Sequence, residues 1–288
     1  MGRRRRVHFP ALSYRVLLAM CCALLVLCAA TGAAMRASLT DYNSDIGALD
    51  ALPFVVRPAL KERLRLASDD EVLRQMTAAF GEDASLHSLA EGADALGISR
   101  QNLSDGAELV LTGTFAGKRT YGYQAFASEI EVTSVIKGSG VSVGDVIVVY
   151  EGFEVLEPGN FTGMGQFSTA REIVPAGMTP NSYGAGFLRE GEEYLFFLNQ
   201  KRDGAHEGAS DAERRYCQIN SPYGHVSLSV PSDSGQVRVS PILAEQGAGD
   251  ERILLKEARR FDMFVTDETA KQVYLESCEN LLAEYVVR

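Results

Sequence analysis

Histidines, the side chains that most often bind metals or transfer protons, are few in this chain of 288 residues. Three of the four histidines, His87, His206 and His225, come after the first 36 residues. His206 and Glu207 lie in a polar stretch that we expect to be a loop, and a metal site with His225 is conceivable. The spacing matches no metal motif, and the chain contains neither His-Glu-x-x-His nor a Walker-type phosphate loop. We therefore expect no catalytic residues, no metal and no cofactor, and favour a binding protein over an enzyme.

The five cysteines fall into two groups. Cys21, Cys22 and Cys28 lie in an apolar run near the N-terminus, where we expect them to act as small apolar residues. Cys217 and Cys278 lie far from that run. In an oxidising compartment these two thiols can form one disulfide, which would tie a C-terminal helix to the β-rich region. Two separately buried thiols are the alternative.

The N-terminal segment predicts the compartment. Residues 1–15 are basic, with Arg3 to Arg6 and Arg15, and residues 16–35 form an uncharged, mostly apolar run. A helix of this length spans about 30 Å, the thickness of the hydrocarbon core of a bilayer. Because basic residues stay on the cytoplasmic side, we expect a single-pass signal anchor in the cell membrane, with the N-terminus inside and the rest of the chain outside.

Other interpretations of this segment remain open. The small residues from Ala29 to Ala34 suit a cleaved signal peptide, in which case the protein is secreted. A lipoprotein signal is disfavoured because Met20 and Leu27, and not small residues, precede Cys21 and Cys28. A buried helix of a soluble core is disfavoured because the run is apolar on all sides and comes after a basic cluster.

The net charge of −10 conceals two regions of opposite sign. Residues 1–36 contain six arginines and no acidic residue, whereas residues 37–288 contain 22 basic and 38 acidic residues. The acidic balance argues against nucleic acid as the main partner. A hydrophobic content of 46% excludes global disorder. The chain beyond the N-terminal segment is long enough for a β-domain with accompanying helices.

The sequence of residues 37–104 predicts a stalk and short helices. From Asp105 onward the pattern becomes typical of β-strands. Ser68 is placed to cap a helix that Gly81 ends, and a weaker helix is expected at 84–96. We assign residues 105–245 to a β-barrel, because many short strands separated by turn residues are typical of barrels and sandwiches. The expected strands are 108–115, 121–137, 146–150, 193–198, 215–220, 225–230 and 236–240.

Residues 250–288 predict C-terminal helices that pack on the barrel. The first is expected at 250–261, and Thr266 is expected to cap the second. Ala270, Tyr274, Cys278, Leu281 and Tyr285 recur at intervals of three or four residues in the second helix. This stripe favours a packing face on the barrel over an exposed groove for a partner.

About 40 residues separate the expected strands at 146–150 and 193–198, which is long for a loop in a compact domain. They are rich in glycine and include Phe153, Phe161, Met164 and Phe167. Long loops on rigid β-scaffolds often carry binding residues, so these four form the candidate binding loop. The alternative is an extra hairpin whose aromatic residues close the end of the barrel.

The order of strands and turns resembles the netrin/TIMP-like OB-type barrel found in exported bacterial proteins. The resemblance rests on Glu108-Leu-Val-Leu-Thr-Gly113, on Val135-Ile-Lys-Gly138, on Gly144-Asp-Val-Ile147 and on Gly191-Glu-Glu-Tyr-Leu-Phe-Phe-Leu198. It implies an α+β chain whose small antiparallel OB-like barrel is flanked by helices. The chain lacks the Cys-x-Cys edge with which TIMP-type inhibitors enter metalloproteases, so the resemblance does not imply protease inhibition.

The sequence thus favours a membrane-anchored or exported protein whose extracytoplasmic barrel acts as a binding module. The expected partners are the membrane, through residues 16–35, and a protein or cell-envelope ligand. An exported hydrolase with an unrecognised active site is one alternative. A subunit of a cell-envelope assembly is another.

Overall fold

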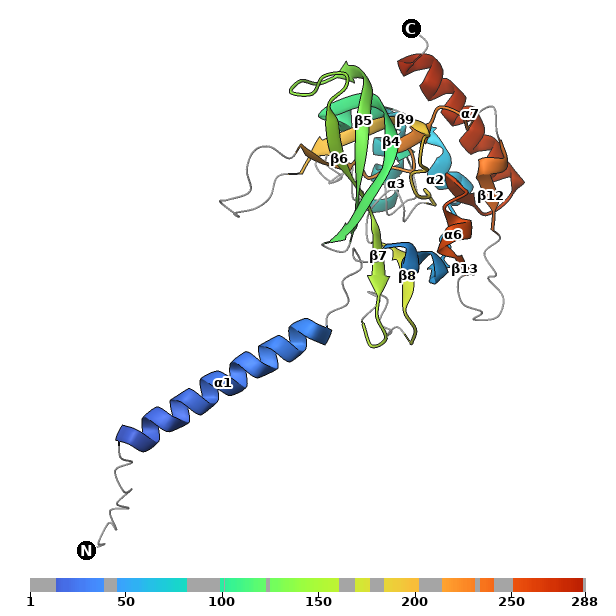
Figure 1. The fold of residues 1–288 in the computed structure, drawn as a ribbon. Coiled ribbons are helices and arrows are strands. Elements are labelled where there is room, and N and C mark those ends of the chain that lie inside the picture. Colours follow the sequence, from blue (N-terminus) through green and yellow to red (C-terminus); the bar gives the residue numbers. More distant parts are fainter. Residues whose placement is uncertain are drawn as a thin grey trace, which may run out of the picture. The chain divides into compact units, whose positions relative to one another are not determined.

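The structure is a computed structural model of the chain, which divides into two compact units, residues 1–44 and 45–288. Figure 1 shows the elements of both units. The structure describes residues 14–38, 46–81, 99–100, 102–122, 125–160, 169–176, 184–201, 214–230, 234–240 and 251–286.

The first unit contains helix α1 (Tyr14–Ser38), which covers the uncharged run. The side chains described in it, Val16 and residues 18–32, are exposed. Over the part of the chain that the structure describes, no helix combines the length and the apolar character that crossing a membrane requires.

A closed five-stranded barrel forms the centre of the second unit. Its strands are β4 (Leu109–Gly122), β5 (Ala125–Lys137), β6 (Val146–Glu151), β9 (Glu193–Gln200) and β10 (Arg215–Gln218). They pair in the circular order β4-β5-β6-β10-β9, and β9 returns to β4. Strand β11 (His225–Ser227) pairs with β9 beside β10.

One strand pair differs from the antiparallel arrangement expected from the sequence. β6 and β10 run parallel, with Val149 opposite Tyr216, while the other four barrel pairs are antiparallel. Strand directions cannot alternate around a closed ring of five, so at least one neighbouring pair must be parallel.

Alternating side chains fill the barrel, as the period of β5 predicts. Ile130 and Val132 are buried in the core cluster of the barrel, and Phe126 is buried against Phe187. Ile136, which simple alternation along β5 would place on the same face, is exposed, because a β-bulge opposite Val110 and Leu111 leaves it without a cross-strand partner in β4.

The long segment before β9 contains a hairpin. β7 (Phe153–Leu156) and β8 (Glu172–Pro175) pair antiparallel in a four-stranded sheet of order β13-β1-β8-β7, with β1 (Pro53–Val55) and β13 (Arg252–Leu254). Phe153 is fully buried and stacks on Phe187, with ring centroids 3.8 Å apart. This part of the segment therefore forms a hairpin, and a binding role for Phe153 stays a prediction. Phe161, Met164 and Phe167 lie outside the described residues.

The helix predicted after Ser68 is confirmed as α3 (Asp69–Phe80). The Ser68 hydroxyl accepts a hydrogen bond from the Glu71 amide at 3.3 Å, and Gly81 ends the helix with a φ of 87°. The weaker helix expected at 84–96 lies outside the described residues.

The C-terminal helices differ from the expectation in two respects. In place of a helix over 250–261, β13 pairs with β1 and only α6 (Leu255–Ala258) is helical, because strand pairing overrides the local helical pattern. The last helix, α7 (Glu268–Tyr285), is capped by Asp267 and not by Thr266, since the Asp267 carboxylate accepts from the Ala270 amide at 2.8 Å.

The packing stripe of α7 is confirmed. Ala270, Tyr274, Cys278 and Leu281 are buried in a core cluster that also includes Phe197 of the barrel. Figure 1 shows α7 beside the barrel strands. The remaining elements are η1 (Ile46–Ala51), α2 (Lys61–Leu64), β2 (Leu66–Ala67), β3 (Ser99–Arg100), α5 (Leu103–Gly106), η4 (Ser234–Gln236), β12 (Val237–Val239) and β14 (Met263–Val265).

Candidate functional site

A pocket of about 630 Å³ lies among β4, the turn before β9, η4 and the turn after α6. Four of its lining residues are arginines, at positions 119, 189, 259 and 260. The other lining residues are Phe115, Gly117, Leu188, Glu190, Gly235, Gln236 and Phe261. We call this cavity the arginine pocket.

Arg119 is held by one buried carboxylate. Its Nε lies 2.8 Å from Oε1 of Glu151, whose side chain is fully buried, and its Nη2 donates to the Leu188 carbonyl at 2.7 Å. The other Glu151 oxygen accepts from the Leu188 amide at 2.7 Å, and the Ser128 hydroxyl also donates to this carboxylate. One positive charge thus meets one negative charge, and backbone and hydroxyl groups complete their hydrogen bonds.

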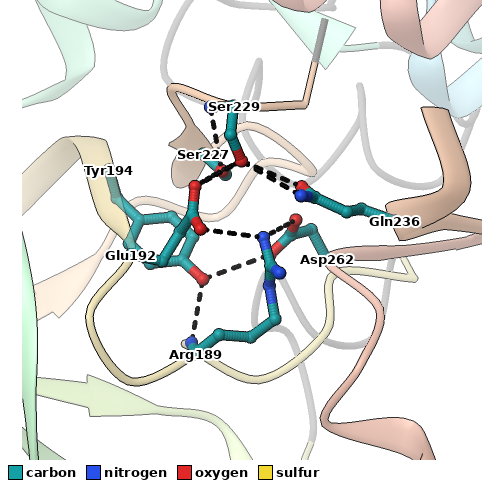
Figure 2. Close-up of polar contacts among 7 residues, drawn as sticks. All are labelled: Arg189, Glu192, Tyr194, Ser227, Ser229, Gln236 and Asp262. Atoms are coloured by element: carbon teal, nitrogen blue, oxygen red, sulfur yellow. Dashed lines mark hydrogen bonds and ion pairs between the residues drawn. The ribbon is translucent and has the colours of Figure 1, made fainter. Parts of the chain in front are cut away.

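Arg189 is held by two carboxylates, as Figure 2 shows. Its Nε and Nη2 donate to the two oxygens of Asp262 at 3.1 and 3.0 Å, and Nη2 lies 3.2 Å from Oε2 of Glu192. The Tyr194 hydroxyl donates to Asp262 at 3.1 Å and accepts from the Arg189 amide at 2.8 Å. The bidentate contact fixes the plane of the Arg189 guanidinium.

The Glu192 carboxylate also accepts hydrogen bonds from β11 and the turn after it. The Ser227 hydroxyl donates to Glu192 Oε1 at 2.7 Å, and the Ser229 hydroxyl donates to the same oxygen. Ser229 in turn contacts the Gln236 side chain at 3.1 Å (Figure 2). The turn before β9 is thereby joined to η4, and both line the arginine pocket.

The pKa values in this second cluster are set by burial and by the excess of acid. Burial raises the pKa of Asp262 to about 6, even though Arg189 and Tyr194 favour its charged form. Burial and the nearby Asp262 carboxylate raise the pKa of Tyr194 well above its ordinary value. Burial opposes the charge of Arg189, but Asp262, Tyr194 and Glu192 together outweigh that effect and keep the pKa of Arg189 above its ordinary value.

Arg259 and Arg260 complete the positive lining. Arg259 forms an ion pair with Asp50 at 2.5 Å, and its Nε is buried without a hydrogen-bond partner among the described residues. Burial and then the positive charge of Arg119 lower the pKa of Arg259. Arg260 is exposed and pairs with no acidic side chain in the described ranges. It is therefore the guanidinium with the most hydrogen-bonding capacity to spare.

Glu190 places one carboxylate on the pocket wall. It is exposed and lies close to Gly117, where an added Cβ would come within 2.7 Å of the Glu190 carboxyl carbon. Gly117 also has a φ of 87°, which side-chain-bearing residues rarely adopt. This glycine thus provides the room that the Glu190 side chain occupies.

The arrangement is suited to hold an oxyanion. Four arginines line the cavity, whereas the acids that hold Arg119 and Arg189 are not among its lining residues and are buried, with Glu151 fully buried and Asp262 1% exposed. Among the described residues, Glu190 and the partner acids Glu151, Asp262, Glu192 and Asp50 provide five carboxylates beside the four guanidiniums. Hydrogen-bond geometry, more than net charge, therefore favours an anion here.

Comparison with protein-family models, curated proteins and solved structures finds no match for this chain. The functional assignment of the arginine pocket rests on its own geometry.

His225 does not join a metal site in the described part of the chain. It is buried against the rings of Tyr194 and Phe196, its Nδ1 lies 2.6 Å from Gln218 Oε1, and its Nε2 has no described partner. Burial lowers the pKa of His225 to about 4, so the ring is neutral at physiological pH. His206 and Glu207 lie outside the described residues, within which no group of three metal-binding side chains gathers.

In this structure the sulfur atoms of Cys217 and Cys278 are not joined in a disulfide. Cys217 is half-buried in β10, and Cys278 is buried in α7, where burial raises the pKa of its thiol. A disulfide between them stays a prediction.

One hydrolase-like pattern lies in a turn between strands. Gly140-Val-Ser142-Val-Gly144 has the Gly-x-Ser-x-Gly spacing of a nucleophile elbow, which the sequence expectations did not include. An elbow needs a strand followed by a helix, whereas this segment connects β5 to β6 and the Ser142 amide donates to the Asp145 carboxylate at 2.7 Å. Asp145 therefore stabilises a hairpin turn, and the serine is not presented on an elbow.

The arginine pocket was not predicted from the sequence. Its arginines are spread over 142 positions, from Arg119 to Arg260, and match no motif. Only the adjacent pair Arg259-Arg260 gave a local signal of positive charge.

Proposed function

We propose that this protein is a binding module that holds an anionic group of its ligand in the arginine pocket. The observation that carries the proposal is that four guanidiniums line one cavity and retain N–H groups beyond those used in their ion pairs. Guanidinium forks match carboxylates, sulfates and phosphates in shape and hydrogen-bonding direction.

Two of the arginine side chains that line the pocket are already ordered by contacts within the protein. Arg119 and Arg189 are fixed by short contacts to buried acids, so binding does not have to order their side chains. Exposed Arg260 adds a positive charge at the rim, and Glu190 disfavours an anion that extends toward Gly117. The expected ligand group is therefore compact and oxygen-rich.

The barrel supports the broader interpretation from the sequence. The circular order β4-β5-β6-β10-β9 with one parallel pair is the strand order of an OB-type barrel, a fold that binds ligands on its loops and open face. Export, with residues 16–35 as membrane anchor or cleaved signal, is part of the proposal and rests on the basic and apolar N-terminal sequence.

Removal of Arg260 tests the function. In calorimetric titrations of the full-length protein with sulfate, Arg260→Ala should weaken binding by about tenfold, the effect of losing one charge-assisted contact. Arg74→Ala, which removes an exposed arginine of α3 that does not line the pocket, is the matched control and should bind like wild type. Equal affinity in all three proteins, or no sulfate binding by wild type, would overturn the proposal.

Labelling from outside intact cells tests the compartment. A tag placed after Arg288 should react with a membrane-impermeant reagent before lysis. Reaction only after lysis would contradict the expected topology.

A further inference from the structure

The acid–base balance differs on the two sides of the arginine pocket. Arg119 faces one buried carboxylate, but Arg189 lies between two, Asp262 and Glu192, which both approach its Nη2. The Arg189 cluster therefore carries an excess negative charge when both acids are ionised. Since Arg189 lines the pocket, that charge opposes an incoming anion.

We propose that the pocket takes up its anion together with a proton, which Asp262 accepts from solvent. This inference rests on the proposed function. The added proton leaves a hydronium ion or a buffer acid, which becomes water or the conjugate base, and forms an O–H bond on the carboxyl group of Asp262; no other covalent bond is made or broken. The Arg189 cluster then becomes neutral, and the guanidinium attracts the anion with less opposition from behind.

The surroundings single out Asp262 as the group that accepts the proton. Its side chain is 1% exposed, whereas that of Glu192 is 20% exposed and accepts hydrogen bonds from two serine hydroxyls. The pKa of Asp262 is raised to about 6 by burial, close to the range in which the coupling would operate.

The other polar groups that face Asp262 are neutral or already committed. Arg189 and Glu192 come from the turn before β9, and Tyr194 comes from β9 itself. Tyr274 and Cys278 of α7 interact electrostatically with Asp262, and burial raises the pKa of each, so both stay neutral. The backbone of η4 also contacts it, because the Asp262 amide donates to the Gln236 carbonyl at 2.9 Å.

The coupling has a definite sign. Protonation of Asp262 favours the anion, so affinity should rise as the pH falls through about 6. By linkage, the bound anion must raise the proton affinity of Asp262 by the same factor. Binding near pH 6 should therefore be accompanied by net proton uptake.

Sulfate is the probe for the test because its charge does not change between pH 5 and 7.5. Wild type should bind sulfate at least about fivefold more tightly at pH 5 than at pH 7.5, the effect of one charge a few ångströms from the anion when the pair is screened as fully as in water. Asp262→Asn should bind with an affinity that does not change over this range. Glu172→Gln, which removes a carboxylate paired with Arg252 in the other sheet, should keep the pH dependence of wild type.

Proton uptake gives a second, independent measurement. Wild-type titrations at pH 6 in two buffers of different ionisation enthalpy should show uptake of a fraction of one proton for each sulfate bound. This measurement needs no variant and so stands even if Asp262→Asn does not fold. Binding without proton uptake and without pH dependence, or a pH dependence retained in folded Asp262→Asn, would overturn the inference but not the proposed function. No sulfate binding at any pH would overturn the proposed function itself.

Discussion

Two arginine clusters meet at the same pocket but are built on different charge ratios. Arg119 has one carboxylate partner, Glu151, and both side chains are almost completely removed from solvent. Arg189 has two carboxylate partners, and its own side chain is 21% exposed. In the first cluster one carboxylate pairs with one guanidinium, whereas in the second two carboxylates pair with one guanidinium.

The difference indicates two roles. A buried pair with matched charge and completed hydrogen bonds fixes geometry, because any change in protonation would leave a buried charge unpaired. A cluster with surplus acid can gain a proton without losing its framework, since Arg189 and Glu192 still form a pair when Asp262 is neutral. We therefore expect the Arg119 cluster to be structural and the Arg189 cluster to respond to pH and to ligand.

The largest difference should appear when one acid is neutralised in each cluster. Glu151→Gln removes the carboxylate that pairs with Arg119. The NH2 group of the glutamine must then face either Arg119 or the Leu188 N–H, both of which are donors. We therefore expect a loss of about 3–5 kcal/mol of unfolding free energy. Glu192→Gln leaves the Arg189–Asp262 pair in place, and we expect a loss of about 1 kcal/mol or less. Urea denaturation at pH 7 measures both. Equal losses would remove the distinction between the clusters.

The next effect is the pH dependence of stability, which should have opposite signs for two buried groups. The pKa of Asp262 is raised from 3.8 to about 6 on folding, so its contribution to stability is lost as the pH rises from about 4 to 6. The pKa of His225 is lowered from 6.5 to about 4, so its contribution is lost as the pH falls through the same window. Each change amounts to about 3 kcal/mol, and in wild type the two contributions offset each other.

Two variants separate these contributions. Relative to wild type, the unfolding free energy of Asp262→Asn should rise by about 3 kcal/mol as the pH increases from 4 to 6.5, because the opposing contribution of Asp262 is gone. That of His225→Gln, also relative to wild type, should fall by a similar amount. Denaturation curves at half-unit pH intervals give both differences. Parallel pH profiles for the three proteins would show that neither group titrates as its burial indicates.

The smallest predicted effect concerns the serines that bind the acids. Ser128→Ala should cost about 2 kcal/mol, because Ser128 is fully buried and bonds to both Glu151 and Arg119. Ser229→Ala should cost about 1 kcal/mol or less, since Ser227 continues to donate to Glu192. Thermal unfolding at pH 7 ranks the two. A larger loss for Ser229→Ala would contradict the assignment of the more rigid role to the Arg119 cluster.

Much of the fold was predictable because it depends on local periodicity. The short strand-like segments separated by turn residues predicted the strands of the barrel, 121–137 among them, and Ser68 and Gly81 predicted both ends of α3. The apolar stripe of α7 was also correct, from Ala270 to Leu281. In each case the side-chain pattern and the environment that buries it lie within one element.

Expectations were less accurate where distant segments pair. The sequence at 250–261 favours a helix, but pairing with β1 converts its first part into strand β13. The parallel alignment of β6 and β10 results from closure of five strands, which no single strand can indicate. These outcomes depend on partners far away along the chain.

By itself, the sequence determined the acidic barrel-forming region, its flanking helices and the basic, apolar N-terminus, because composition and periodicity are local properties. Only the tertiary structure decided that Arg119, Arg189, Arg259 and Arg260 line one cavity, and that one of them faces two acids while another faces one. The physical reason is that a charge cluster depends on distances of a few ångströms, and these are set by the closure of the barrel and the return of the C-terminal segment to it.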